Sequence, residues 1–128
     1  MPSVDVVDET FLAVPPARVA PIFADPAAWA RFWPDLTCEV LADRGLEGMR
    51  WTVGGALTGS MEVWLEPMLD GTCVHYFLRA DPLGPDGPAP LRGRRAVAEV
   101  RRRQRHAKRI AFALKSHLER GRAPGEAP

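Results

Sequence analysis

The side chains that could carry chemistry here are three histidines, two cysteines and one tyrosine: His75, His106, His117, Cys38, Cys73 and Tyr76. The histidines have neither metal-ligand spacing with the cysteines nor a carboxylate partner that the sequence identifies, so no metal is predicted. The chain lacks a glycine-rich phosphate loop, and Ser60 lacks a nucleophile-elbow context. No cofactor is expected, and the lack of a catalytic constellation disfavours an enzyme.

Apolar and aromatic residues stand out instead, because alternation and helical spacing place them on one side of the fold. Two interpretations stay open: ordinary core, or a ligand cavity whose Met and Trp side chains adapt to an irregular apolar shape. Gln104 favours the cavity, because a buried amide in the centre of an apolar stripe would need a partner. The candidate ligand-binding residues are Trp29, Trp33, Cys38, Met49, Trp51, Met61, Val63, Tyr76, Leu78, Gln104 and Ala107.

The elements that position these residues begin with a strand over 4–14 and a short helix over about 16–24. A second short helix follows, with Asp25 as its N-cap, Pro26 at its first position and Pro34 ending it. Its large aromatic residues at i, i+3 and i+4 share one face. We therefore expect this helix to cover an apolar interior with Trp29, Phe32 and Trp33.

Four further strands are predicted over 36–43, 48–54, 60–66 and 73–80. The last two form a hairpin, and one register puts all their apolar residues on one face by pairing Leu65 with Val74, Val63 with Tyr76, and Met61 with Leu78. Residues 81–91 are rich in Pro and Gly and predict a loop. A long amphipathic helix is predicted over about 92–120, ended by Gly121.

Charge is distributed unevenly along the chain. Residues 90–128 carry twelve Arg and Lys against three Glu, whereas residues 1–89 carry five Arg against thirteen Asp and Glu. The basic helix is either a solvated face or a surface for an anionic partner such as a membrane. Nucleic acid is not expected, because the cluster has no aromatic residue for base stacking. The candidates for an anionic surface are Arg101, Arg102, Arg105 and Arg109.

The length of 128 residues suits a single domain, expected over 1–120, with a disordered tail over 121–128. No stretch approaches the ~20 apolar residues of a membrane span, and no leader pattern is present, so we expect a cytoplasmic protein. The two cysteines do not form a secreted disulfide framework and are interpreted as reduced thiols. A homodimer stays open.

Several stretches resemble one known superfamily. They are Pro15 to Val19 opening a helix, Asp25-Pro26 with Trp29 and Trp33-Pro34, Gly59 to Pro67, Gly71 to Tyr76, and the long C-terminal helix. In order and type they resemble the START-related, Bet v 1-like helix-grip superfamily (SRPBCC), within it the bacterial polyketide cyclase/dehydrase-like group of short actinobacterial type.

The resemblance implies an α+β helix-grip fold, in which an antiparallel sheet wraps a long C-terminal helix around an apolar cavity. The strand order would run first, last and then back to second, with five strands here rather than the usual seven. It implies binding of a small hydrophobic ligand, lipid or polyketide-like. The alternatives are a cyclase or dehydratase that uses Tyr76, Cys38 or a water held by Gln104, and an interaction protein whose basic helix docks on an anionic membrane or RNA.

Overall fold

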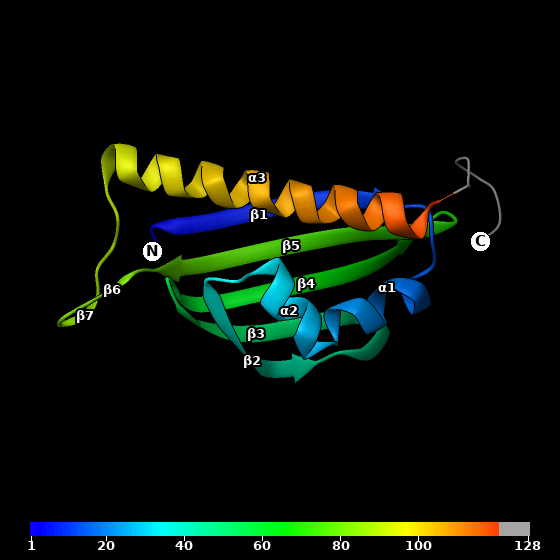
Figure 1. The fold of residues 1–128 in the computed structure, drawn as a ribbon, viewed down its shortest axis with the longest axis horizontal. Helices are drawn as coiled ribbons and strands as arrows, with labels where there is room; N and C mark the ends of the chain where they lie inside the picture. Colours follow the sequence, from blue (N-terminus) through cyan, green and yellow to red (C-terminus); the bar gives the residue numbers. More distant parts are fainter. Residues whose placement is uncertain (121–128) are drawn as a thin grey trace.

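The computed structural model describes residues 1–120, and all three of their helices lie on one face of an antiparallel sheet (Figure 1). The strands are β1 (Val4–Leu12), β2 (Leu36–Asp43), β3 (Gly48–Gly55), β4 (Thr58–Met68) and β5 (Gly71–Asp81). The helices are α1 (Pro16–Phe23), α2 (Pro26–Phe32) and α3 (Gly93–Leu118), with a 3₁₀ turn η1 (Gly45–Glu47).

The strand order is β1-β5-β4-β3-β2, so the first strand pairs with the last and the chain then runs back to the second strand. This order and the five-stranded α+β architecture confirm the predicted fold. The β4–β5 register is also the predicted one, with Leu65 opposite Val74 and Val63 opposite Tyr76. It holds because a slip of one residue would turn every apolar side chain of one strand to the other face.

The two short helices follow from their local sequences. Asp25 accepts a hydrogen bond from the backbone N–H of Ala27 at 3.0 Å, which caps α2. Trp29 and Trp33 are buried below this helix and Phe32 is half-buried, as the shared-face spacing predicts. The indole Nε1 of Trp29 donates to the carbonyl of Phe23 at 2.7 Å and so joins α2 to the end of α1.

Helix α3 lies along β1 with Ala107, Leu114 and Leu118 buried against the sheet (Figure 1). The predicted loop over 81–91 contains a two-residue hairpin, β6 (Leu83–Gly84) with β7 (Gly87–Pro88). Both cysteines are free. The predicted tail over 121–128 lies outside the described residues.

Candidate ligand pocket

A small apolar cavity of about 30 Å³ lies between the sheet and α3. This volume suffices for about two water molecules, so the interior is nearly filled by the protein's own side chains. Residues of β1, α1, β4, β5 and α3 contribute to its wall, together with Trp33. We call it the apolar pocket; it is lined by Asp8, Thr10, Leu12, Phe23, Trp33, Val63, Val74, Tyr76, Ala107, Ile110, Ala111 and Leu114.

The pocket exists because α3 presents short side chains where it crosses the sheet. Ala107 and Ala111 are four residues apart and therefore lie on the same face of the helix. On the opposite wall, the rings of Trp33 and Tyr76 are stacked, with centroids 6.1 Å apart and planes inclined by 10°. Two alanines facing two large aromatic rings leave a gap that a larger helix residue would fill.

One end of the apolar pocket is polar. The Lys108 ammonium lies 3.1 Å from the carboxylate of Asp8 and donates to the hydroxyl of Thr10 at 3.0 Å. That hydroxyl in turn donates to Asp8 at 3.3 Å. An apolar cleft with a few convergent polar groups at one end is the usual form of a small-molecule site.

The structure brings four predicted residues into the lining of this pocket: Trp33, Val63, Tyr76 and Ala107. Five others are buried in the core beside it: Trp29, Met49, Trp51, Met61 and Leu78. Trp51 packs edge-on against Trp29 and Trp33, with centroids 5.6 and 5.4 Å apart. Its indole Nε1 is the buried side-chain atom without a hydrogen-bond partner among residues 1–120.

Cys38 and Gln104 do not line the pocket, although Cys38 packs against the core. Cys38 is half-buried on β2. Gln104 is exposed, so its expected burial in the helix stripe is wrong, and Arg103 takes that place with 3 % of its surface exposed. Successive residues of an α-helix are separated by about 100° around its axis, so either position 103 or position 104 could have continued the apolar stripe of α3.

Sequence reasoning missed the polar end of the pocket and part of its apolar wall. Asp8 and Thr10 belong to β1, and their alternation with Val4 and Val6 on the inner face was the available signal. Leu12, Phe23, Val74 and Ile110 were missed as well, whereas Ala111 and Leu114 belong to the apolar stripe of the predicted long helix and were left out only of the candidate list.

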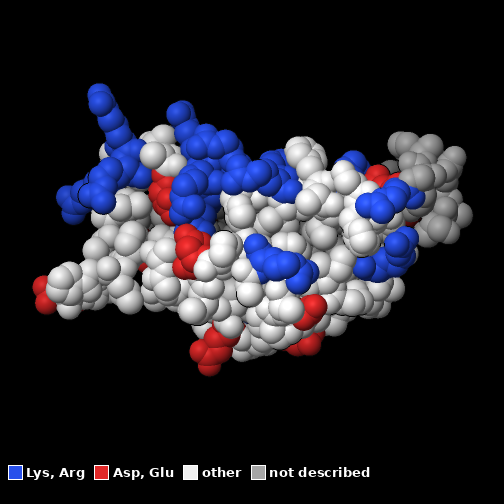
Figure 2. All heavy atoms as spheres, in the orientation of Figure 1, with Lys and Arg blue, Asp and Glu red and all other residues white. Residues whose placement is uncertain are grey.

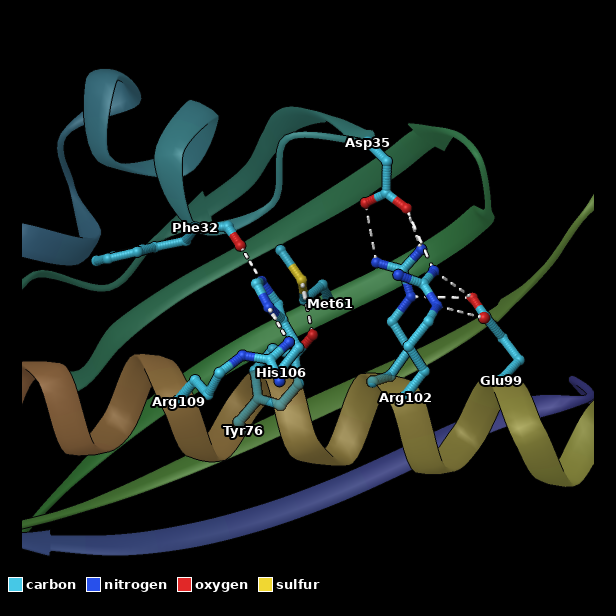
Figure 3. Close-up of polar contacts among 9 residues, drawn as sticks. Phe32, Asp35, Met61, Tyr76, Glu99, Arg102, His106 and Arg109 are labelled. Carbon is cyan, nitrogen blue, oxygen red and sulfur yellow. Dashed lines mark hydrogen bonds and ion pairs between the residues drawn. The ribbon is translucent and has the colours of Figure 1, made fainter.

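The two side chains considered for catalysis have environments that favour their protonated forms. The Tyr76 hydroxyl donates to the sulfur of Met61 at 3.3 Å (Figure 3). Burial raises the pKa of the Tyr76 phenol above its ordinary value, and burial likewise raises the pKa of the Cys38 thiol. Neither group has the lowered pKa that activates a nucleophile at neutral pH.

An ionic cluster holds the corner between α2 and β2 against α3 (Figure 3). The guanidinium of Arg103 donates to both carboxylate oxygens of Asp35, at 3.0 and 2.6 Å, and its Nε donates to Glu99 at 3.0 Å. Arg102 contacts the same two carboxylates from a more exposed position. We call Asp35, Glu99, Arg102 and Arg103 the arginine clasp.

A second contact joins the same two regions. The imidazole Nε2 of His106, on α3, forms a hydrogen bond with the backbone carbonyl of Phe32, and Arg109 lies 3.5 Å from the other ring nitrogen (Figure 3). Trp33, a wall of the apolar pocket, lies between Phe32 and Asp35 in the chain. The clasp and His106 therefore fix the position of Trp33 relative to α3.

The two carboxyl groups of the arginine clasp make the folding stability depend on pH. Burial alone would raise the pKa of Asp35, but hydrogen bonds and charge from Arg103 and then Arg102 hold it below 3.8. The hydrogen bond from Arg102 lowers the pKa of Glu99 below 4.5. Burial acts in the opposite direction, and Arg103 adds to the lowering. Carboxyls with lower pKa values in the folded chain stabilise it above the unfolded-state values and lose this contribution as pH falls through the folded-state values.

We therefore expect the unfolding free energy to decrease as pH falls below about 4.5. An Asp35→Asn variant should start less stable and show a shallower loss over the same pH range, because one of the two carboxyls no longer titrates. Urea unfolding followed by tryptophan fluorescence at a series of pH values measures both slopes. Equal slopes would mean that other carboxyls cause the acid sensitivity.

Comparisons with known proteins find similarity only at the level of structure. No family model matches the chain, and no curated protein matches its sequence. The Aha1 dimer from Colwellia psychrerythraea is similar over 94 % of this chain and 99 % of its own, at 11 % identity and a TM-score of 0.66. Ara h 8.0201 is similar over 89 % of this chain and 95 % of its own, at 16 % identity and a TM-score of 0.51.

DynU16, a protein of the dynemicin biosynthetic locus, is similar over 96 % of this chain but 49 % of its own, at 16 % identity and a TM-score of 0.61. These alignments each span about nine tenths of this chain or more. The protein has the α+β helix-grip fold. Identities this low show the fold and leave the ligand open.

On this helix-grip framework the basic residues gather over the N-terminal half of α3 (Figure 2). Arg101 and Arg105 are exposed there, and Arg109 is exposed one turn further along the helix, as predicted for a solvated or anion-facing surface. Arg102 is exposed as well, and its guanidinium also pairs with Asp35 and Glu99 in the arginine clasp. No helix of residues 1–120 is both long and apolar enough to cross a membrane. Binding to an anionic surface stays a prediction.

Proposed function

We propose that the protein binds a small hydrophobic molecule with one polar end in the apolar pocket. The observation that carries this proposal is the lining of the cavity: aromatic and aliphatic side chains surround it, Asp8 and Thr10 add polar atoms, and Lys108 bonds to both of them. An apolar ligand body would displace water from the wall, while a hydroxyl or carboxylate could exchange hydrogen bonds with Thr10 and Lys108.

The cavity of about 30 Å³ is too small for a lipid or polyketide in the closed arrangement. A ligand must therefore move a wall of the pocket, and Trp33 is the side chain best placed to move. Its neighbour Asp35 is held to α3 by the arginine clasp, whose outer contacts are partly solvent-exposed. Opening of the clasp would release the corner that carries Trp33 and enlarge the pocket.

One structural neighbour supports a small-molecule ligand. DynU16 belongs to a biosynthetic locus, which suits a protein that handles a small organic compound. We infer that the ligand is polyketide-like or lipid-like, and that binding does not need a catalytic residue.

Native mass spectrometry of the purified full chain tests the proposal by detecting a molecule that copurifies with it. A lipophilic fluorescent probe supplies the second measurement. Ala111→Phe should fill the pocket from α3 and reduce probe affinity at least tenfold, since Ala111 lines the cavity. Ala113→Phe is the matched control, because Ala113 is exposed on the same helix and should leave binding unchanged.

The probe affinities of the two variants can be compared only if circular dichroism shows that both are folded. If neither a copurified molecule nor probe binding is found, the aromatic residues are ordinary core and the proposal is wrong. Equal loss in the Ala111 and Ala113 variants would place the probe outside the apolar pocket and would also contradict it.

A further inference from the structure

The outer face of the sheet, opposite the helices, carries a group of metal-ligating side chains that the apolar pocket does not use. His75 on β5 lies between Glu9 on β1 and Trp64 on β4, and Cys73 lies one rung further along β5, opposite Glu66. Cys73 and His75 are buried on this face, with 6 % and 8 % of their surfaces exposed. Most polar residues on the solvent face of a sheet are exposed, so this burial needs an explanation.

Three ligand atoms of different types converge there. One oxygen of Glu9, the sulfur of Cys73 and a ring nitrogen of His75 all lie within 4.8 Å of one another. The Nδ1 atom of His75 is 3.2 Å from the Glu9 carboxylate. Two ligands about 2.0 Å from a tetrahedral zinc ion lie about 3.3 Å apart, so this pair already has the separation that a shared zinc ion requires.

The histidine ring is held in the orientation that metal binding through Nδ1 needs. Its other nitrogen, Nε2, lies 3.0 Å from the carboxylate of Glu66. Trp64 stacks on the ring with centroids 4.3 Å apart, and the ring of Phe77 lies nearly parallel to it at 6.4 Å. A carboxylate that accepts from the distal N–H fixes the tautomer and leaves the metal-facing nitrogen with its lone pair.

We propose that Glu9, Cys73 and His75 form a zinc-binding site on the outer face, with Glu66 as the residue that positions the histidine. Thiolate, imidazole and carboxylate are the ligands that zinc takes in proteins, and three protein ligands leave a fourth position for water. Glu9 is the exposed member, with 63 % of its side chain accessible, so the open position faces solvent.

Electrostatics favour a cation at this place. Two carboxylates, Glu9 and Glu66, flank one imidazole, and the Arg and Lys ion pairs of residues 1–120 involve other acids. Lys108 contacts the backbone carbonyl of Glu9 but forms its ion pair with Asp8. The sequence predicts no metal, because spacing along the chain does not reveal that β1 brings Glu9 beside β5.

The competing explanation for this arrangement is an ion-paired imidazolium. His75 would then bridge the carboxylates of Glu9 and Glu66, and Cys73 would take no part in the interaction. The two explanations differ in the role of the thiol. A metal site needs the sulfur of Cys73, whereas an ion-paired imidazolium does not.

Titration of the full chain, first treated with a chelator and then with Co²⁺, separates them. We expect one equivalent of Co²⁺ to bind with a sulfur-to-cobalt charge-transfer absorption band, and one equivalent of Zn²⁺ to displace it. Cys73→Ser should remove the band and weaken Zn²⁺ binding at least tenfold by calorimetry. Cys38→Ser is the matched control, since the other free cysteine lies on β2 away from this cluster.

A Glu66→Gln variant tests the positioning residue, and loss of such a partner typically weakens metal affinity by about 10- to 100-fold while the band persists. Absence of metal binding, or binding that survives Cys73→Ser, would overturn the proposal. Because Ser replaces Cys with little change in volume, a failure to fold is not expected, and thermal unfolding of metal-free Cys73→Ser verifies this.

Discussion

Replacing Trp33 with Ala should lower the unfolding free energy by about 3–5 kcal/mol, the usual cost of removing a large aromatic side chain from a core. Trp33 is 2 % exposed, stacks on Tyr76 and packs edge-on against Trp51 and Phe32. Its removal would also join a new void to the cavity of about 30 Å³. Urea unfolding followed by circular dichroism measures the loss.

The enlarged pocket should then accept a molecule of the size that was removed. Indole added in excess is expected to raise the melting temperature of Trp33→Ala and to leave the wild-type melting temperature unchanged, because ligands that bind only the folded state stabilise it. Trp64→Ala is the control. Trp64 is half-buried on the outer face, so this variant should lose less stability and gain none from indole.

An indole effect of equal size in the two variants would mean that the Trp33 site is not a defined cavity. A loss below about 1 kcal/mol in Trp33→Ala would show that the surrounding side chains collapse into the space. In that case the wall cannot hold a ligand either, and the proposed pocket would fail with it.

The sheet could be predicted because its information is local and repeated. Alternation along residues 60–66 and 73–80 fixed the hairpin register, since a period of two leaves only one arrangement with all apolar residues on one face. Asp25 and Pro26 likewise mark the start of α2 by their own backbone chemistry. These features need no knowledge of distant residues.

The polar sites could not be predicted because their partners are distant in sequence. Arg103 is buried through an ion pair with Asp35, 68 residues away. In the sequence it stands beside Arg101, Arg102 and Arg105, and nothing in the local sequence distinguishes it from them. The outer-face group needs the β1–β5 register, which the imperfect alternation of residues 4–14 does not fix. Polar burial is decided by tertiary pairing, and hydrophobic periodicity does not report it.

Breaking the arginine clasp should cause the second large loss of folding stability. Asp35→Ala should lower the unfolding free energy by about 3 kcal/mol, the lower end of the cost of leaving a buried charge without its partner. Arg103 is 3 % exposed and would lose two of its three hydrogen bonds, keeping only the bond to Glu99. Thermal or urea unfolding of the full chain provides the measurement.

Second-site variants test whether the buried guanidinium causes this loss. Adding Arg103→Met to Asp35→Ala removes the unpaired charge while keeping much of the side-chain volume, so it should recover about 1 kcal/mol or more. Adding Arg102→Gln instead should recover nothing, because the Arg102 side chain is 51 % exposed and water already solvates its charge. The two arginines are neighbours with the same acidic partners, so burial is the main difference between them. If both double variants recover equally, desolvation of Arg103 is not the cause, and the clasp would be an ordinary surface ion pair too weak to control the position of Trp33.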